Sequence, residues 1–474
     1  MGGEDYRGRR VLVVGLARSG LAAARFLLHR GARVRANDAR PAEELSPEVA
    51  ALADRGVEVV TGSHPAGLTR EIDLVVVSPG VPSDVMPLQE ARRDAIPVLG
   101  ELELAFREIE GPVVAVTGTK GKSTTATLIA QILRRAGHHV VLGGNIGQPL
   151  SGLVEESPLD GTFVVEVSSF QLESTERFRP KVAVLLNVTP DHLDRHPSFE
   201  AYREAKERIF SNQEREDWAV VYGANPLTRK MANRSRSRKL FYSLECIGDR
   251  EPHLCIKEGW VVQHEDSFTN GWIPLEDINL LGEHNVENVM AAAAASHVLG
   301  VESGVMSEVV GSFRGIAHAL ERIGEIRGVS FYDDSKATNV AAAQAAIASF
   351  EGNVILVLGG RSKGANFEVL RDDVKGKVKL VLSLGESRAQ IAEALSGEVP
   401  VLPCAGLREV VERAFAHSEP GDTVLFSPAC ASFDMFADYA ERGRLFKEEV
   451  RRLEKSLATD KGNKSSRERK RTRR

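Results

Sequence analysis

The sequence has few cysteines, no apolar run long enough to span a membrane and no signal-peptide core at its N-terminus. Its four cysteines, Cys246, Cys255, Cys404 and Cys430, include no C-x-x-C pair and no metal-ligand spacing. We therefore expect free thiols in a reducing cytoplasm. The formal net charge of −5 gives no reason to expect nucleic acid as the main partner.

The composition is that of an ordinary globular protein, 42% hydrophobic and 27% charged, which argues against a disordered or fibrous chain. A length of 474 residues is enough for two to four domains, each with its own core. Short β-branched runs alternate with helical periodicity, so the fold class that we predict is α/β with parallel sheets.

A strand, a glycine turn and a helix start meet near residue 118. The run Val113–Val116 is typical of a buried parallel strand. Gly118 and Gly121 then allow a tight turn that exposes several N–H groups to one small volume. Lys122 adds a cation and Ser123 a hydroxyl able to ligate Mg²⁺, at the N-terminus of a predicted helix.

This phosphate loop is shorter than the usual Walker pattern, because Val116 stands where that pattern has glycine. The alternative interpretation is a glycine turn that binds no phosphate. The strand before the turn and the helix after it favour a phosphate site over a plain loop. The sequence therefore predicts an ATP site formed by Gly118, Thr119, Lys120, Gly121, Lys122, Ser123 and Thr124.

The N-terminal residues begin a nucleotide-binding α/β unit, with a strand over 10–14, a turn at Gly15–Gly20 and a second strand ending at Asp38. Ala17 replaces the second glycine of the dinucleotide fingerprint, which disfavours NAD; a phosphate group over the turn is the alternative. A further strand ends in the turn Ser78–Pro82, either a plain loop or part of the ligand-binding edge.

Polar residues also follow the next predicted strands. Glu166 ends a strand near the phosphate loop, where a carboxylate can hold Mg²⁺ directly or through water. His192 and His196 have the spacing of a zinc pair, but Pro197 breaks the helix that such a pair needs. We therefore interpret His192 as a polar site residue. Lys206, on an amphipathic helix, is expected to be solvated on this evidence alone.

The rest of the chain continues the alternation. Residues 241–277 have the short alternating runs of antiparallel hairpins. Strands expected over 354–358, 379–384 and 423–426 end in small and polar residues, which places those residues on one rim of a parallel sheet. The segment 455–474 is polar, strongly basic and without apolar periodicity, so we expect a disordered tail.

Together these motifs resemble the Mur ligase family over the whole chain except the basic tail. The family-wide motifs are Gly118–Thr124, Glu166–Glu173, Asn187–His192 and Gly282–Asn288. Two others, Asp334–Asn339 and Ser427–Asp434, are similar to motifs of the branch that adds D-glutamate. Several long motifs in the right order are far more specific than any one of them.

The resemblance implies three domains: a Rossmann-like domain over 1–102 that holds the UDP part of the substrate, a P-loop ATPase domain over 103–314 with a parallel sheet, and a Rossmann-like domain over 315–454 that binds the amino acid. It implies a cytoplasmic, monomeric ligase of peptidoglycan precursor synthesis. Such an enzyme uses ATP to join D-glutamate to UDP-N-acetylmuramoyl-L-alanine through an acyl phosphate, giving ADP and phosphate.

The resemblance also implies roles for single residues. Those implied in catalysis are Lys122, His192, Lys206 and Lys336, and either His192 or a Lys206 carbamate could take up the proton. Asn288 and Asp334 are implied on the ATP side. Two Mg²⁺ ions are implied at Ser123, Glu166, His192 and carbamylated Lys206. The residues implied around the substrates are Gly15, Leu16, Ser19, Asp38, Ser78, Gly80 and Asn145 for the UDP-muramoyl part, and Thr338, Lys363, Ser432 and Tyr439 for D-glutamate.

One position departs from the family pattern. Where the family has His-Arg-x-Glu, this chain has His318-Ala319-Leu320-Glu321, so we expect weaker nucleotide binding unless Arg322 compensates. Two rival functions are a folylpolyglutamate synthetase-like ligase and a P-loop ATPase switch. The first would not need an N-terminal UDP domain or the motif Asp334–Asn339, and the second would release phosphate without needing an amino acid. A Rossmann dehydrogenase is a third rival, which the missing dinucleotide fingerprint disfavours.

Overall fold

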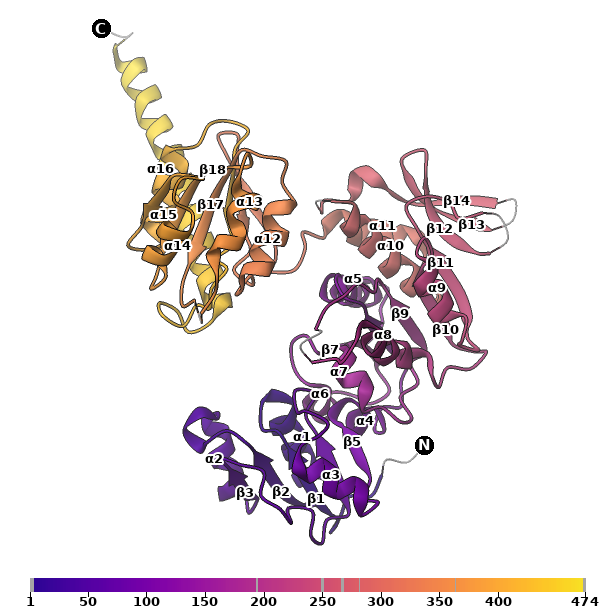
Figure 1. Cartoon of the computed structure of the whole chain (residues 1–474). Coiled ribbons are helices and arrows are strands. Elements are labelled where there is room, and N and C mark those ends of the chain that lie inside the picture. The colour runs from indigo at the N-terminus through magenta and orange to yellow at the C-terminus, as the bar shows by residue number, and fades with distance from the viewer. Residues whose placement is uncertain are drawn as a thin grey trace. The chain divides into compact units, whose positions relative to one another are not determined.

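The computed structural model describes residues 4–192, 195–248, 251–265, 268–280, 282–362 and 364–471. Internal contacts divide the chain into two compact units, Met1–Phe313 and Arg314–Arg474 (Figure 1). We call them unit 1 and unit 2. Among the described residues, no helix is both long and apolar enough to cross a membrane.

Unit 1 begins with a five-stranded parallel sheet of order β3-β2-β1-β4-β5. Its strands are β1 (Arg10–Val14), β2 (Arg33–Asp38), β3 (Glu58–Thr61), β4 (Leu74–Val77) and β5 (Val98–Gly100). The connecting helices are α1 (Arg18–His29), η1 (Ala42–Glu44), α2 (Pro47–Asp54), α3 (Met86–Arg93) and α4 (Glu101–Phe106). Apolar β-branched residues fill β1 and β4, as expected of strands buried on both faces.

The second sheet of unit 1 has the order β14-β13-β12-β11-β10-β9-β6-β8-β7. Its strands are β6 (Val113–Thr117), β7 (Val140–Gly144), β8 (Thr162–Glu166), β9 (Val182–Leu185), β10 (Trp218–Tyr222), β11 (Arg238–Tyr242), β12 (His253–Lys257), β13 (Trp260–Glu265) and β14 (Phe268–Pro274). The helices are α5 (Lys122–Arg135), α6 (Leu150–Glu156), α7 (Ser169–Glu173), α8 (Phe199–Glu207), η2 (Arg208–Phe210), α9 (Pro226–Ala232), η3 (Leu275–Asp277), α10 (Glu283–His297) and α11 (Ser303–Ser312).

Unit 2 has a sheet of order β15-β16-β20-β17-β18-β19, in which only the β15–β16 pair is antiparallel. Its strands are β15 (Glu321–Ile326), β16 (Val329–Asp333), β17 (Val354–Gly359), β18 (Val378–Leu384), β19 (Val401–Pro403) and β20 (Thr423–Phe426). The helices are α12 (Val340–Ala348), η4 (Phe367–Leu370), α13 (Arg371–Val374), α14 (Arg388–Ala394), α15 (Leu407–Ala416) and α16 (Tyr439–Arg471). The α/β class with parallel sheets is therefore confirmed.

Three expectations need comment. The hairpins expected over 241–277 are present for β12–β14, but β11 pairs with β12 in parallel. Helix α16 has helical backbone through much of the segment expected to be disordered, and the part before that segment packs Phe446 and Val450 into the core of unit 2.

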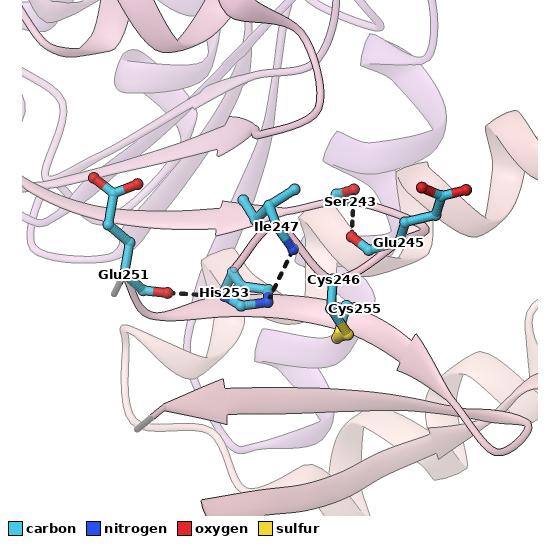
Figure 2. Close-up of a disulfide and its surroundings, with 7 residues drawn as sticks. All are labelled: Ser243, Glu245, Cys246, Ile247, Glu251, His253 and Cys255. Carbon is cyan, nitrogen blue, oxygen red and sulfur yellow. Dashed lines mark hydrogen bonds between the residues drawn. A yellow bond between two sulfur atoms is a disulfide. The ribbon is translucent and has the colours of Figure 1, made fainter. Parts of the chain in front are cut away.

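The prediction of four free thiols is wrong for Cys246 and Cys255, which form a disulfide (Figure 2). β12 runs parallel to β11, so the loop between them returns to the start of β12. Cys246 in this loop and Cys255 on β12, nine residues apart, thus have a Cα–Cα distance of 5.0 Å. Cys404 and Cys430 are free and buried.

One hydrophobic core runs through both sheets of unit 1. It includes Val13 of the first sheet, Leu102 of α4, and Ala115 and Phe163 of the second sheet, all fully buried or nearly so. The predicted boundary at residues 102–103 falls inside this shared core.

The buried carboxylate of Glu103 on α4 binds the segment between α7 and β9. It accepts hydrogen bonds from the backbone N–H groups of Glu176, Arg177 and Phe178 at 2.9–3.0 Å, and from Arg107 Nε at 2.9 Å. Its side chain is fully buried. Four donors at one carboxylate satisfy the charge that burial would otherwise leave without solvation.

We expect Glu103→Ala to lower the free energy of unfolding by about 3–5 kcal/mol, because it leaves the Arg107 cation and three backbone N–H groups, that of Phe178 buried, without this acceptor. Urea unfolding followed by circular dichroism measures the change. Glu110→Ala is the matched control, because that side chain is exposed on the same segment. Equal losses in the two variants would contradict the role given to Glu103.

Candidate active site

The phosphate loop and two polar loops leave the second sheet at neighbouring strand ends. β6 lies between β8 and β9, with Val116 opposite Glu166 and Thr117 opposite Leu185. Because all three strands are parallel, the loops that follow them emerge on the same edge of the sheet. This register explains why sequence-distant motifs lie together.

The phosphate loop has little room for side chains. Gly121 precedes helix α5 with a φ of 84°, and a Cβ there would lie 2.1 Å from Asn288 Oδ1. Asn187 Oδ1 accepts from the N–H groups of Thr119 and Lys120 at 3.1 and 2.9 Å. These contacts fix a backbone turn directly before the N-terminus of α5, a geometry suited to binding phosphate. Thr124 follows in the first turn of that helix, and Thr125 Oγ1 lies 3.4 Å from Asn288 Oδ1.

Two lysines from distant segments converge on Gly118. Lys122 Nζ and Lys206 Nζ donate to the Gly118 carbonyl oxygen at 3.0 and 2.9 Å. Lys206 is only 2% exposed, so the expectation of a solvated helix lysine is wrong. Its ammonium lies 4.6 Å from the centre of the Tyr202 ring. Burial, and then the charge of Lys122, lower the pKa of Lys206 to about 7.

A cluster of oxygen ligands lies beside the helix start. Ser123 Oγ donates to Glu166 Oε2 at 2.6 Å, and Asn145 Nδ2 donates to Glu166 Oε1 at 2.7 Å. Glu166 is 2% exposed. A carboxylate and a hydroxyl are the hard oxygen donors that Mg²⁺ prefers, so these residues fit the ion that the phosphate site implies.

His192 and His196 have different environments. The His192 side chain is half exposed, with a φ of 54°, and its ring centroid lies 5.2 Å from that of Phe170. His196 is buried; its Nε2 lies 2.9 Å from Ser169 Oγ, and its ring stacks on Phe170. Burial lowers the pKa of His196. Sequence reasoning missed His196 and Tyr202 as supports of the site, because their hydrogen-bond partners, Ser169 and Thr119, lie far away in the sequence.

The N-terminal residues implied around the substrate also lie together in unit 1. Asp38 Oδ2 accepts from Leu16 N at 2.7 Å, and Ser78 Oγ donates to Gly15 O at 2.8 Å. Burial raises the pKa of Asp38, but hydrogen bonds from Arg40 and from Leu16 N–H outweigh it and hold the pKa at about 2. Ser19 is half-buried in α1, and Gly80 is exposed in the turn after β4.

A cavity of about 480 Å³ adjoins this turn. Its lining combines residues of the first turn and α1 with residues of α6 and of the loop before it, and includes Leu16, Arg18, Arg25, Arg40, Glu48, Gln148, Gly152, Glu155 and Glu156. The cavity is lined by three arginines and three glutamates, and two of the arginines, Arg25 and Arg40, form ion pairs with Glu48 and Asp38. Guanidinium groups are the donors here that could bind a diphosphate.

Unit 2 has its own polar cluster at the ends of β16 and β20. Asp334 Oδ2 accepts from Ser427 Oγ at 2.6 Å, and Leu320 N donates to Asp334 Oδ1 at 3.1 Å. Lys336 N donates to the His318 carbonyl at 2.9 Å. Ala319 is half-buried, and the Arg322 guanidinium pairs with Glu325 at 2.9 Å.

The residues implied around D-glutamate have mixed exposure. Thr338 is exposed, Ser432 is 2% exposed, and Tyr439 begins α16 with 39% exposure. Lys363 lies outside the described residues.

Comparison with known families matches the chain in three consecutive parts. Residues 9–100 match the Mur ligase MurD-like N-terminal domain, 116–296 the Mur ligase middle domain, and 320–430 the Mur ligase glutamate ligase domain. The chain belongs to the Mur ligase family.

Curated relatives narrow the comparison to one branch. A UDP-N-acetylmuramoylalanine–D-glutamate ligase from Acidobacterium capsulatum is 46% identical over 448 residues, covering 94% of this chain and 97% of the relative. A relative of the same name from Pelotomaculum thermopropionicum is 43% identical and covers 95% and 99% of the two chains.

Solved structures agree on the fold. The UDP-N-acetylmuramate-alanine ligase of Thermotoga maritima gives a TM-score of 0.54 at 19% identity and covers 94% of this chain and 99% of that one. The MurF ligase of the same organism, solved with ADP, gives 0.54 at 20% identity and covers 95% and 96%.

Asp334 yields a prediction about pH. Burial raises its pKa to about 7, against the opposing effect of the Ser427 hydrogen bond, from an ordinary value of 3.8. Between these values the folded state binds more protons than the unfolded state, so stability falls as pH rises from about 4 to about 7. Asp334→Asn removes this titration.

We therefore expect the melting temperature of Asp334→Asn to fall less than that of the parent protein over this pH range. Thermal unfolding followed by circular dichroism at several pH values tests it, with the exposed Asp372→Asn as control. Parallel curves for the parent and Asp334→Asn would show that Asp334 is not protonated in the folded protein.

Proposed function

We propose that this chain uses ATP and Mg²⁺ to join D-glutamate to UDP-N-acetylmuramoyl-L-alanine. The observation that carries the proposal is the phosphate loop with Ser123, Glu166 and Lys206 at one sheet edge, in a chain whose relatives are named for that reaction. A cytoplasmic location, a monomeric state and the domain boundaries at 102–103, 314–315 and 454–455 belong to the same proposal.

The chemistry requires activation of a carboxylate, because its leaving group would otherwise be oxide. Transfer of the γ-phosphoryl group of ATP to the carboxylate gives an acyl phosphate, which the amine of D-glutamate attacks with loss of phosphate. In this proposal the backbone of Gly118, Thr119, Lys120 and Gly121 holds the ATP phosphates, and Lys122 offsets the negative charge that gathers during transfer.

The residues around Glu166 bind the metal in this proposal. Ser123, Glu166, His192 and carbamylated Lys206 would hold two Mg²⁺ ions, which neutralise phosphoryl oxygens when bound. Asn145, which donates to Glu166, orients that carboxylate and reaches the muramoyl part of the substrate. His192 or the Lys206 carbamate accepts the proton released by the amine.

The remaining residues are assigned to the UDP part of the first substrate, to ATP and to D-glutamate. The residues that hold the UDP part, beside the cavity next to the first glycine turn, are Gly15, Leu16, Ser19, Asp38, Ser78 and Gly80. Asn288 and Asp334 contact ATP, and Lys336 reaches the reaction centre. Thr338, Lys363, Ser432 and Tyr439 surround D-glutamate. With Ala319 in place of arginine and Arg322 paired with Glu325, nucleotide binding relies on the phosphate loop more than in relatives that keep that arginine.

Phosphate release measured with ATP tests the reaction. We expect release only when UDP-N-acetylmuramoyl-L-alanine and D-glutamate are both present, with L-glutamate a poor replacement. Lys122→Ala should abolish ligation while the far-ultraviolet circular dichroism stays unchanged. Phosphate release without an amino acid would favour an ATPase switch, and turnover with a folate substrate would favour the folylpolyglutamate ligase alternative.

Lys206 gives a separate test. A pKa of about 7 leaves much of the amine uncharged near neutral pH, which is the form that reacts with CO₂. The carbamate carries negative charge and oxygen ligands, so Mg²⁺ and the modification stabilise each other. We expect Lys206→Ala to lose most of its activity and added acetate to restore part of it.

The control for Lys206→Ala is Lys230→Ala, which removes an exposed lysine of the same domain. Activity of the parent protein should also fall in CO₂-depleted buffer and recover with bicarbonate. Full activity of Lys206→Ala would remove the carbamate from the proposal while leaving the ligase assignment in place.

A further inference from the structure

The disulfide loop contains a histidine as well as two cysteines. Cys246 lies in the loop after β11, whereas His253 and Cys255 lie two positions apart on β12 and therefore on the same face of that strand (Figure 2). A sulfur of each cysteine and a ring nitrogen of His253 all lie within 4.8 Å of one another. We call these three residues the Cys-His cluster.

The hydrogen bonds of His253 leave one ring nitrogen suited to a metal. Nδ1 lies 2.8 Å from the Glu251 carbonyl oxygen, which can only accept, so Nδ1 carries the proton (Figure 2). Nε2 is therefore the unprotonated nitrogen, and it accepts a long hydrogen bond of 3.4 Å from Ile247 N, which a bound metal ion would replace. A histidine whose second nitrogen donates to a backbone carbonyl is the usual arrangement of a metal ligand.

The dimensions fit a tetrahedral ion once the disulfide is reduced. In a tetrahedral site with Zn–S bonds of about 2.3 Å, two thiolate sulfurs lie about 3.8 Å apart. After reduction, the two sulfurs therefore need to move apart only by about 2 Å. The ring of His264, paired with His253 across β12 and β13, lies 5.1 Å from the His253 ring and places a second imidazole beside the cluster.

Exposure provides a route for both the reductant and the ion. Cys246 is exposed, whereas His253 and Cys255 are fully buried. A small thiol can therefore attack the Cys246 sulfur, and an ion can enter from the same side. Thiolate and imidazole donors favour Zn²⁺ over the Mg²⁺ that oxygen donors bind, so this cluster and the Glu166 cluster select different metals.

We propose that the Cys-His cluster is a redox-dependent Zn²⁺ site. Two molecules of a low-molecular-weight thiol reduce the disulfide, giving two cysteine thiols and one disulfide of the reductant. Both thiols then release their protons to solvent as Zn²⁺ binds, and His253 contributes neutral Nε2, with water as the fourth ligand. The disulfide of the same thiol is the oxidant for the reverse step: it accepts the two electrons, takes up two protons from solvent to give back two molecules of the thiol, re-forms the Cys246–Cys255 disulfide and so releases the ion.

Cobalt titration of the untagged full-length protein tests the site, since Co²⁺ bound to thiolates in a tetrahedral site absorbs strongly and Zn²⁺ displaces it. The protein is first reduced with a phosphine, and saturating Mg²⁺ occupies oxygen-ligand sites. We expect one equivalent of Co²⁺ to give the thiolate absorption in the reduced protein and none in the oxidised protein.

The variants Cys246→Ser and Cys255→Ser should lose this absorption, and His253→Gln should lower Zn²⁺ affinity by at least about tenfold. Cys430→Ser is the matched control, because Cys430 is a buried free thiol of unit 2 and should leave binding unchanged. Absorption that persists in Cys246→Ser, or is equal in oxidised and reduced protein, overturns the proposal. If a variant fails to fold, the comparison of the two redox states of the parent protein still decides.

Discussion

The pairing register of β6 with β8 and β9 is the constraint on which the rest of the site depends. Hydrogen bonds on both sides of β6 put Glu166 and the Asn187 loop level with the phosphate turn. A slip of one residue would turn Glu166 to the other face of the sheet and separate it from Ser123. The fully buried apolar residues of β6 and β8 make such a slip costly, because each would exchange its packing partners.

Charge is concentrated at the same place. Two ammonium groups, of Lys122 and Lys206, donate to the single carbonyl of Gly118, while the Glu166 carboxylate is occupied by Ser123 and Asn145. Repulsion between the lysines and the burial of one of them favour an uncharged Lys206. The fold therefore places two amines at the phosphate turn, and the charge of one of them, Lys206, depends on its surroundings.

The sequence alone predicted those parts of the fold and site that depend on local pattern. The strands that end at Asp38 and Glu166, and the helix after Ser123, follow from β-branched runs and glycine turns. Burial of Lys206 could not be predicted, because it depends on how α8 packs against a turn 88 residues away. The same holds for the Cys246–Cys255 pair, whose proximity results from parallel pairing of β11 and β12. The pattern Cys-x₆-His-x-Cys was the one signal available in the sequence.

The hydrophobic core shared by the two sheets of unit 1 restricts how the chain can be divided. Val13 and Leu102 pack in the same core as Ala115 and Phe163, so removing residues before 103 would uncover an apolar face of the second sheet's helices. Such a fragment would be prone to aggregate. Gene fusion or circular permutation is better placed at the junction of Phe313 and Arg314, where the two units meet in sequence and each keeps its own core.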